Sequence, residues 1–202
     1  MASVSISGDV SGAISIAAPS AAGSGVLTLP TGTDTLVGKA TTDTLTNKSI
    51  AATQLTGTIA AAALPAGSVL QVVNATYAVA NTTTSTSYVD TNLTATITPT
   101  RNTSKILVMV CQTGCEKEST NINFLLKLQR NSADIALMEQ FGGYNGLTTL
   151  QNFGSCTIDF LDSPATTSAT TYKTQFACSA AGRVYTQQNN GTSTITLMEI
   201  AG

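Results

Sequence analysis

The sequence predicts an all-β protein: a C-terminal β-sandwich of about eight strands, jelly-roll-like, preceded by an extended, low-complexity N-terminal arm. Three observations favour this fold class. Only 10% of the 202 residues are charged, and 36 are threonine, so the residues that stabilise helices are scarce. Apolar and polar residues alternate over short stretches, which is the period of a half-buried strand. The composition also changes sharply near residues 65–67.

This change of composition divides the chain into an arm, residues 1–66, and a head domain, residues 67–202. The arm contains no aromatic residue, and its charges are Asp9, Asp34, Lys39, Asp43 and Lys48. A segment with so little to bury cannot offset the backbone entropy lost on folding, about 1–2 kcal/mol per residue. We therefore expect the arm to become ordered through contacts with other chains.

The arm nevertheless contains short strand-like patterns. Residues 4–6 and 14–16 alternate as strands do, and residues 26–30 form a strand-like run that ends at a proline. Residues 33–39 then recur as residues 42–48, each copy carrying one apolar leucine. Three chains wound around an axis would bring these leucines together, so we expect a homotrimer in which the arm contacts other proteins of the assembly.

Alternation in the head domain predicts the strands and their inward faces. Leu93, Ala95 and Ile97 form one apolar face, for example, while the threonines between them face water. The predicted strands are residues 68–74, 86–98, 104–112, 122–130, 134–141, 155–162, 170–178 and 193–200. Residues 106–111 are apolar on both faces, which predicts a cover on the outer side: a neighbouring subunit or a covering loop.

Two loops are the candidates for ligand contact because they carry aromatic and amide groups. The first, residues 142–146, contains Tyr144 and Asn145. The second, residues 185–191, contains Tyr185, Gln187 and Gln188.

Most catalytic and cofactor chemistry is disfavoured. The chain has no histidine and no Cys-x-x-Cys pair among Cys111, Cys115, Cys156 and Cys178, so neither a metal nor another cofactor is expected. The cysteines are interpreted as buried thiols, with a Cys156–Cys178 disulfide as the alternative. A net charge of -2 without basic runs disfavours nucleic-acid binding, and no apolar stretch is long enough for membrane insertion.

Residues 32–40 resemble a phosphate-binding loop but have one residue too many, and Ala40 stands where a hydroxyl should hold magnesium. Two carboxylate pairs, Glu116/Glu118 and Asp159/Asp162, leave glycan hydrolysis as a remote alternative. The simpler interpretation makes residues 116–118 an exposed charged loop or edge and Asp162 the start of a turn. We expect no enzymatic activity.

Several segments together resemble the fibre and decoration proteins of tailed bacteriophages. Residues 25–38 and 43–50 resemble their low-complexity shafts, and residues 96–99, 105–108 and 195–200 resemble their head domains. The resemblance covers most of the chain. It implies a trimeric structural protein of the virion, short tail-fibre or head-fibre-like, assembled in the bacterial host cytoplasm and fixed by its N-terminal arm.

The resemblance also implies an outward-facing sandwich, either as capsid decoration or as the tip of a receptor-binding tail fibre. The tip would recognise a glycan or protein of the host cell surface. No binding residues carry over, because no matched motif defines them.

Overall fold

The computed structural model describes residues 3–7, 13–17, 49–51, 53, 56–146 and 151–202. It contains two compact units, Met1–Thr56 and Gly57–Gly202. In the first unit, strands β1 (Ser3–Ser7) and β2 (Ala13–Ala17) pair antiparallel, with Ser3 opposite Ala17. The strand-like patterns of residues 4–6 and 14–16 are confirmed. The run at 26–30, the repeat at 33–48 and the phosphate-loop-like segment lie outside the described residues.

In the second unit, all eight predicted strands of the head domain are confirmed. They are β3 (Val69–Tyr77), β5 (Val89–Ile97), β6 (Lys105–Lys117), β7 (Phe124–Arg130), β8 (Ala133–Gly142), β9 (Gln151–Asp162), β10 (Thr170–Cys178) and β12 (Ser193–Ile200). Two short strands that the sequence analysis missed are β4 (Asn81–Thr83) and β11 (Val184–Thr186). No helix among the described residues is long and apolar enough to cross a membrane.

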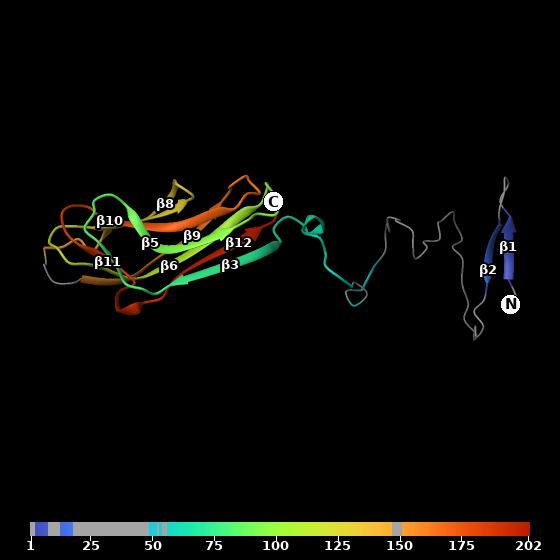
Figure 1. Cartoon of the computed structure of the whole chain (residues 1–202), viewed down its shortest axis with the longest axis horizontal. Coiled ribbons are helices and arrows are strands. Elements are labelled where there is room, and N and C mark those ends of the chain that lie inside the picture. Colours follow the sequence, from blue (N-terminus) through green and yellow to red (C-terminus); the bar gives the residue numbers. More distant parts are fainter. Residues whose placement is uncertain (1–2, 8–12, 18–48, 52, 54–55, 147–150) are drawn as a thin grey trace. The chain divides into compact units, whose positions relative to one another are not determined.

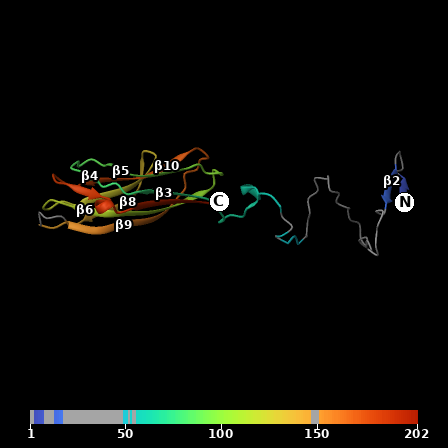
Figure 2. The ribbon, with the colours of Figure 1, turned by 60° about the horizontal axis from the view of Figure 1, so that its bottom comes forward.

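The eight long strands form a jelly roll. The first of these strands pairs antiparallel with the last, the second with the second last, and so on. The pairs are β3 with β12, β5 with β10, β6 with β9, and β7 with β8. This nesting produces two four-stranded layers, β5-β10-β7-β8 and β3-β12-β6-β9 (Figures 1 and 2). Such an order of strands is the jelly-roll arrangement of two Greek keys. The short strands β11 and β4 extend the second layer beside the end of β6.

The core between the layers is divided into two apolar halves. The first contains Leu93, Val108 and Tyr172, and the second contains Phe124, Phe176 and Val184. Each half is built from the inward parity of strands in both layers, as the alternation predicts. The division follows from the polar residues that occupy the inward positions between the two halves.

These polar residues form a buried belt, which we define as Thr91, Gln112, Thr174 and Ser193, all fully buried. Thr174 Oγ1 donates to Gln112 Oε1 at 2.8 Å, and Gln112 Nε2 donates to Ser193 Oγ at 3.1 Å. The hydroxyls of Thr91 and Thr174 share a hydrogen bond of 2.5 Å. Because an unsatisfied buried polar group costs about 1–3 kcal/mol, the belt holds β5 and β10 in register with β6 and β12.

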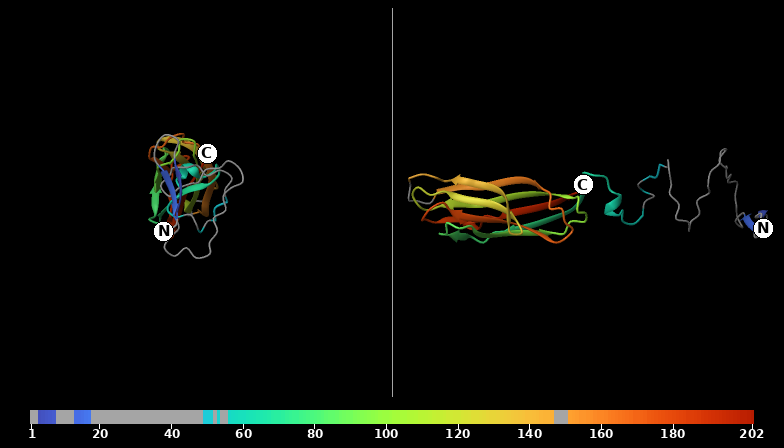
Figure 3. Two further views of the ribbon diagram at one scale, coloured as in Figure 1. Left: turned by 90° about the vertical axis from the view of Figure 1, so that its right-hand side faces the viewer. Right: turned by 90° about the horizontal axis from the view of Figure 1, so that it is seen from above.

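The strands run lengthwise, so turns gather at the two ends of the sandwich (Figure 3). We call one end the root, because the chain enters β3 there: Gly67 N donates to Ala201 O at 2.7 Å, beside the C-terminus (Figure 1). The guanidinium of Arg101 donates to the carbonyls of Ala61 and Leu64, which fastens the 3-10 helix η2 (Ala61–Ala63) at the root. The opposite end, where β6 stops at Lys117, we call the tip.

A buried carboxylate holds the root together. Glu199 on β12 is fully buried and accepts from Gln71 Nε2 on β3 at 2.6 Å. Its other oxygen accepts from the backbone N and the hydroxyl of Thr100 at 2.7 and 2.8 Å. Burial acts to raise the pKa of Glu199, but the hydrogen bonds from Gln71 and Thr100 outweigh it and lower the pKa below 4.5. The folded domain therefore favours the charged form.

Glu199→Gln should reduce the free energy of unfolding by about 2–3 kcal/mol at pH 7, because the amide cannot accept from every donor that faces it. The folded pKa lies below the unfolded value of 4.5, so Glu199 stabilises fully above pH 4.5 and loses this effect as the pH falls through its folded pKa. Urea unfolding of both proteins at pH 7 and pH 3 measures this. A difference that stays constant between the two pH values would contradict the role of the charge. Asp134→Asn, at an exposed carboxylate, serves as the control with the smaller effect.

Candidate functional site

The tip is built by an extension of β6 that the sequence analysis did not anticipate. Strand β6 pairs with β12 as far as Cys111 and continues to Lys117, where it pairs with β11 and β9. The continuation passes through Gly114, at φ +58°, where a Cβ atom would lie 2.3 Å from Gln188 N. Only glycine permits this close approach of β6 to the turn at residues 187–190.

Lys117 fastens the first candidate loop from inside. Its side chain is fully buried, and Nζ donates to Ser119 O at 2.8 Å, to Asn145 O at 3.2 Å and to Asn145 Oδ1 at 2.7 Å. Burial lowers the pKa of Lys117. Gly143, at φ +70°, leaves room for this side chain, because a Cβ there would lie 3.0 Å from Lys117 Cγ. Asn145 therefore positions the loop through its contacts with Lys117.

The expectation that residues 116–118 form an exposed loop or edge is wrong for two of them. Glu116 is 5% exposed and accepts from Asn152 Nδ2 at 2.8 Å, while Lys117 is 0% exposed. A run of charged residues in a sequence predicts a solvated surface. In the structure, each of these buried charges forms a hydrogen bond with a polar group from a strand or loop distant in sequence. Glu118 is half-buried beside the second candidate loop.

Tyr185 belongs to this second loop, and its hydroxyl is occupied within the chain. It donates to Glu118 Oε2, and Arg183 lies 3.8 Å from the same carboxylate. Burial and the bond to Glu118 raise the pKa of Tyr185. Because Lys117 and Glu118 are neighbours on the chain, the two loops meet at the same end of the sandwich.

The five candidate residues differ in their access to a ligand. Tyr144 is 60% exposed and Gln188 is half-buried. Gln187 is fully buried, with Nε2 donating to Ser193 Oγ at 3.1 Å, so it supports the loop from inside. Its Oε1 atom has no hydrogen-bond partner among the described residues. Tyr144 is thus the candidate that presents most of its surface to solvent.

One aromatic that the sequence analysis did not select is more exposed than Tyr144. Phe141 lies at the end of β8, three residues before Tyr144, and is 78% exposed. Its position in an alternating strand hides this exposure from a reading of the sequence, because β8 pairs with β7 through several register shifts. Together Phe141 and Tyr144 place two exposed rings beside the first loop.

Three of the four carboxylates in the two candidate pairs are engaged by partners within the domain. Asp159 points outward from β9, whereas Asp162 points inward, is 8% exposed and accepts from Tyr172 at 2.6 Å and from Arg130 at 2.9 Å. Glu116 is buried against Asn152, and Glu118 is engaged by Tyr185 and Arg183. Each carboxylate except Asp159 is held by a partner within the domain.

The cysteines are all free thiols, as the main interpretation predicts. Cys115, Cys156 and Cys178 are buried and Cys111 is half-buried. The pair that lies together is Cys115 with Cys156, whose thiols interact across β6 and β9, and not Cys156 with Cys178. The interaction with Cys156 and burial raise the pKa of Cys115. Within the described residues, no group of three or more ligating side chains could hold a metal ion.

Lys117→Met should destabilise the domain by about 3 kcal/mol, because the carbonyl oxygens of Ser119 and Asn145 lose their buried cationic donor. Hydrogen–deuterium exchange should show faster exchange around residues 141–146. Lys173→Met, which breaks a more exposed ion pair with Asp90, should cost no more than about 1 kcal/mol. Equal losses in the two variants would show that Lys117 is not a structural anchor of the tip.

No protein-family model matches the chain, and no curated protein matches it. Among solved structures, the chain is similar to the crystal structure of the infectious bursal disease virus VP2 subviral particle, with 11% identity and a TM-score of 0.42. The match covers 65% of this chain and 33% of that one, so this chain aligns with about a third of that protein's length. A likeness this distant carries no argument about function.

Proposed function

We propose that this chain is a structural protein of a bacteriophage virion: a homotrimeric fibre or capsid-decoration subunit anchored by residues 1–66, with no catalytic role. The observation that carries the proposal is the difference between the two ends of the jelly roll. The chain enters and leaves the domain at the root, and the loops with exposed rings gather at the opposite tip. A domain fixed at its root presents its tip outward.

The composition of the sandwich supports a structural role. The polar groups of the buried belt and those around Glu199 at the root form hydrogen bonds between strands. These contacts hold the layers together. The aromatic-free arm adds to this support, because it lacks the residues needed for a core of its own.

Gold-labelled antibodies against the purified full chain would test the proposal on gradient-purified virions produced from the genome that encodes it. We expect label at defined positions on the head or on the tail. Pre-immune serum is the control. Virions that carry neither label nor the chain in their protein profile would contradict a virion role.

A second function, adhesion to a glycan or protein of the host surface, is supported by the rings of Tyr144 and Phe141 at the tip. Aromatic rings supply apolar area and stacking surfaces at low entropic cost.

Tyr144→Ala should therefore weaken binding of the fluorescently labelled full chain to host cells roughly tenfold or more. Leu137→Ala is the matched control, because Leu137 is similarly exposed at 62% but lies in the middle of β8. Equal binding by both variants and the unmodified chain would exclude Tyr144 from the contact. Binding by none of the three would leave decoration as the preferred role.

A further inference from the structure

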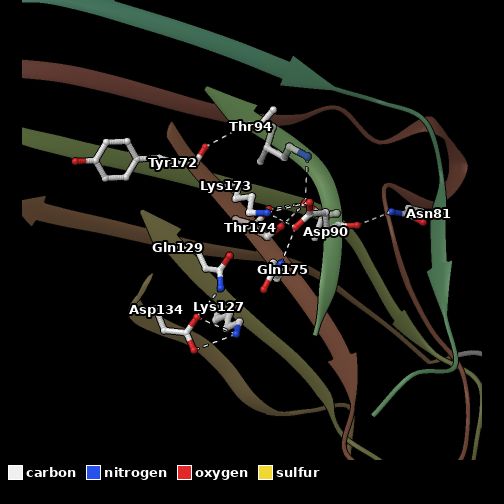
Figure 4. Close-up of polar contacts among 12 residues, drawn as sticks. Asn81, Asp90, Thr94, Lys127, Gln129, Asp134, Tyr172, Lys173, Thr174 and Gln175 are labelled. Carbon is white, nitrogen blue, oxygen red and sulfur yellow. Dashed lines mark hydrogen bonds and ion pairs between the residues drawn. The ribbon is translucent and has the colours of Figure 1, made fainter. Parts of the chain in front are cut away.

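The two outer faces of the sandwich differ in how their polar groups are paired. On the layer β5-β10-β7-β8, Asp90 forms an ion pair with Lys173, with 2.8 Å between Oδ1 and Nζ (Figure 4). Asp90 Oδ1 also accepts a hydrogen bond from Gln175 Nε2 at 2.7 Å. Burial acts to raise the pKa of Asp90, but these two hydrogen bonds outweigh it and lower the pKa. On the same layer, Asp134 forms an ion pair with Lys127 and accepts a hydrogen bond from Gln129 (Figure 4). The charged groups of this face are paired with one another, as charges on a surface in contact with water should be, and Leu137 is its exposed leucine.

The outer face of the layer β3-β12-β6-β9 is apolar near the root. Val72, Met198, Leu107 and Leu161 lie side by side in one row across the four strands. Val72 is 55% exposed and Leu161 is 52% exposed. In the adjoining row toward the root, Ile200 pairs with Val69, which is 47% exposed. We call these six residues the apolar face; a contiguous exposed patch of this kind marks a contact with another protein.

Two charges that have no partner in the described part of the chain flank this apolar face. Within residues 57–146 and 151–202, each charged side chain other than Lys105 and Asp159 has an ion pair or a hydrogen bond. Lys105 and Asp159 have opposite charges, are both exposed, and point outward from neighbouring strands. Lys105 pairs with Ile200 in the row on one side of Leu107, and Asp159 pairs with Met109 in the row on the other side.

Lys105 and Asp159 cannot pair within one chain. Residue 105 and residue 109, the neighbour of Asp159, are four residues apart on β6, which corresponds to about 13 Å along a strand. The side chains therefore lie too far apart for an intramolecular ion pair. Each nevertheless has its complement on the same surface of another copy.

A shallow hollow lies beside the apolar row. Its volume is about 380 Å³, and Met109, Cys111, Thr157, Asp159, Thr194 and Thr196 line it. The half-buried Met109 and Cys111 belong to the doubly apolar stretch for which the sequence predicts an outer cover. Among the described residues, this part of the sheet remains open, so a side chain from another subunit has room to enter.

We propose that a second copy of this chain binds the apolar face, with Lys105 of one copy paired to Asp159 of the next. This inference rests on the proposed homo-oligomer and names its contact surface. A copy is favoured over an unrelated partner because the two unpaired charges sum to zero and complement each other. A contact between different edges of the same face can close into a ring, as a trimer requires.

A charge swap in the full-length chain tests the pairing. Lys105→Glu and Asp159→Lys should each raise the dissociation constant of the oligomer roughly tenfold or more, because like charges then face each other. The double variant should recover association. Sedimentation velocity at micromolar concentration measures this, and thermal unfolding checks that each variant is folded. Thr96→Glu, which adds a charge to the outer face of the other layer, should leave association unchanged.

A second pair of variants tests the apolar contact. Leu161→Asp should dissociate the oligomer, whereas Leu137→Asp, at a comparably exposed leucine of β8, should not. An oligomer that withstands Leu161→Asp and both single charge variants would overturn this surface while leaving the homo-oligomer intact. A monomeric unmodified chain would overturn both proposals. Failure of the double charge variant to recover association would overturn the Lys105–Asp159 pair.

Discussion

Closure of the jelly roll depends on the contacts of the Glu199 carboxylate. The first and last strands of the domain, β3 and β12, are neighbours in one layer. Strand β5 belongs to the other layer, and the chain passes back to the first layer through Thr100, between β5 and β6. Glu199 joins three segments, because from β12 it accepts hydrogen bonds from Gln71 of β3 and from Thr100 of the crossover. A neutral side chain could not accept from so many donors at once. The root is therefore fixed by charge, in a chain that carries few charges.

Neutral polar groups connect the layers in the middle of the domain, at positions where many proteins place hydrocarbon. The buried belt crosses between the layers at Thr91, Thr174, Gln112 and Ser193, and it separates the two apolar halves of the core. Hydrophobic contacts are tolerant of small shifts, but a chain of hydrogen bonds has one geometry. The belt thus fixes the register of the layers, while the apolar halves supply most of the burial.

Local alternation explains why the eight long strands and their inward faces were predictable. The pattern of Leu93, Ala95 and Ile97 is visible in the sequence because it repeats every two residues. The short strands β4 and β11 have three residues each and depend on pairing with strands distant in sequence. Local alternation therefore does not predict them. The burial of Lys117 was equally unpredictable, because its partner Asn145 lies 28 residues away. The candidate loops were found through their composition, but only the structure separates exposed Tyr144 from buried Gln187.

The distribution of paired charges distinguishes the surfaces that meet water from the surface proposed to meet a copy. Asp90 and Asp134 are neutralised by partners within their own layer. Lys105 and Asp159 have no partner among the described residues, and they lie on the face that also exposes Val72 and Leu161. Since the apolar face lies near the root and the exposed rings lie at the tip, self-association and outward contact would use opposite ends of the same strands. Subunits could then join at their roots without covering Tyr144 or Phe141.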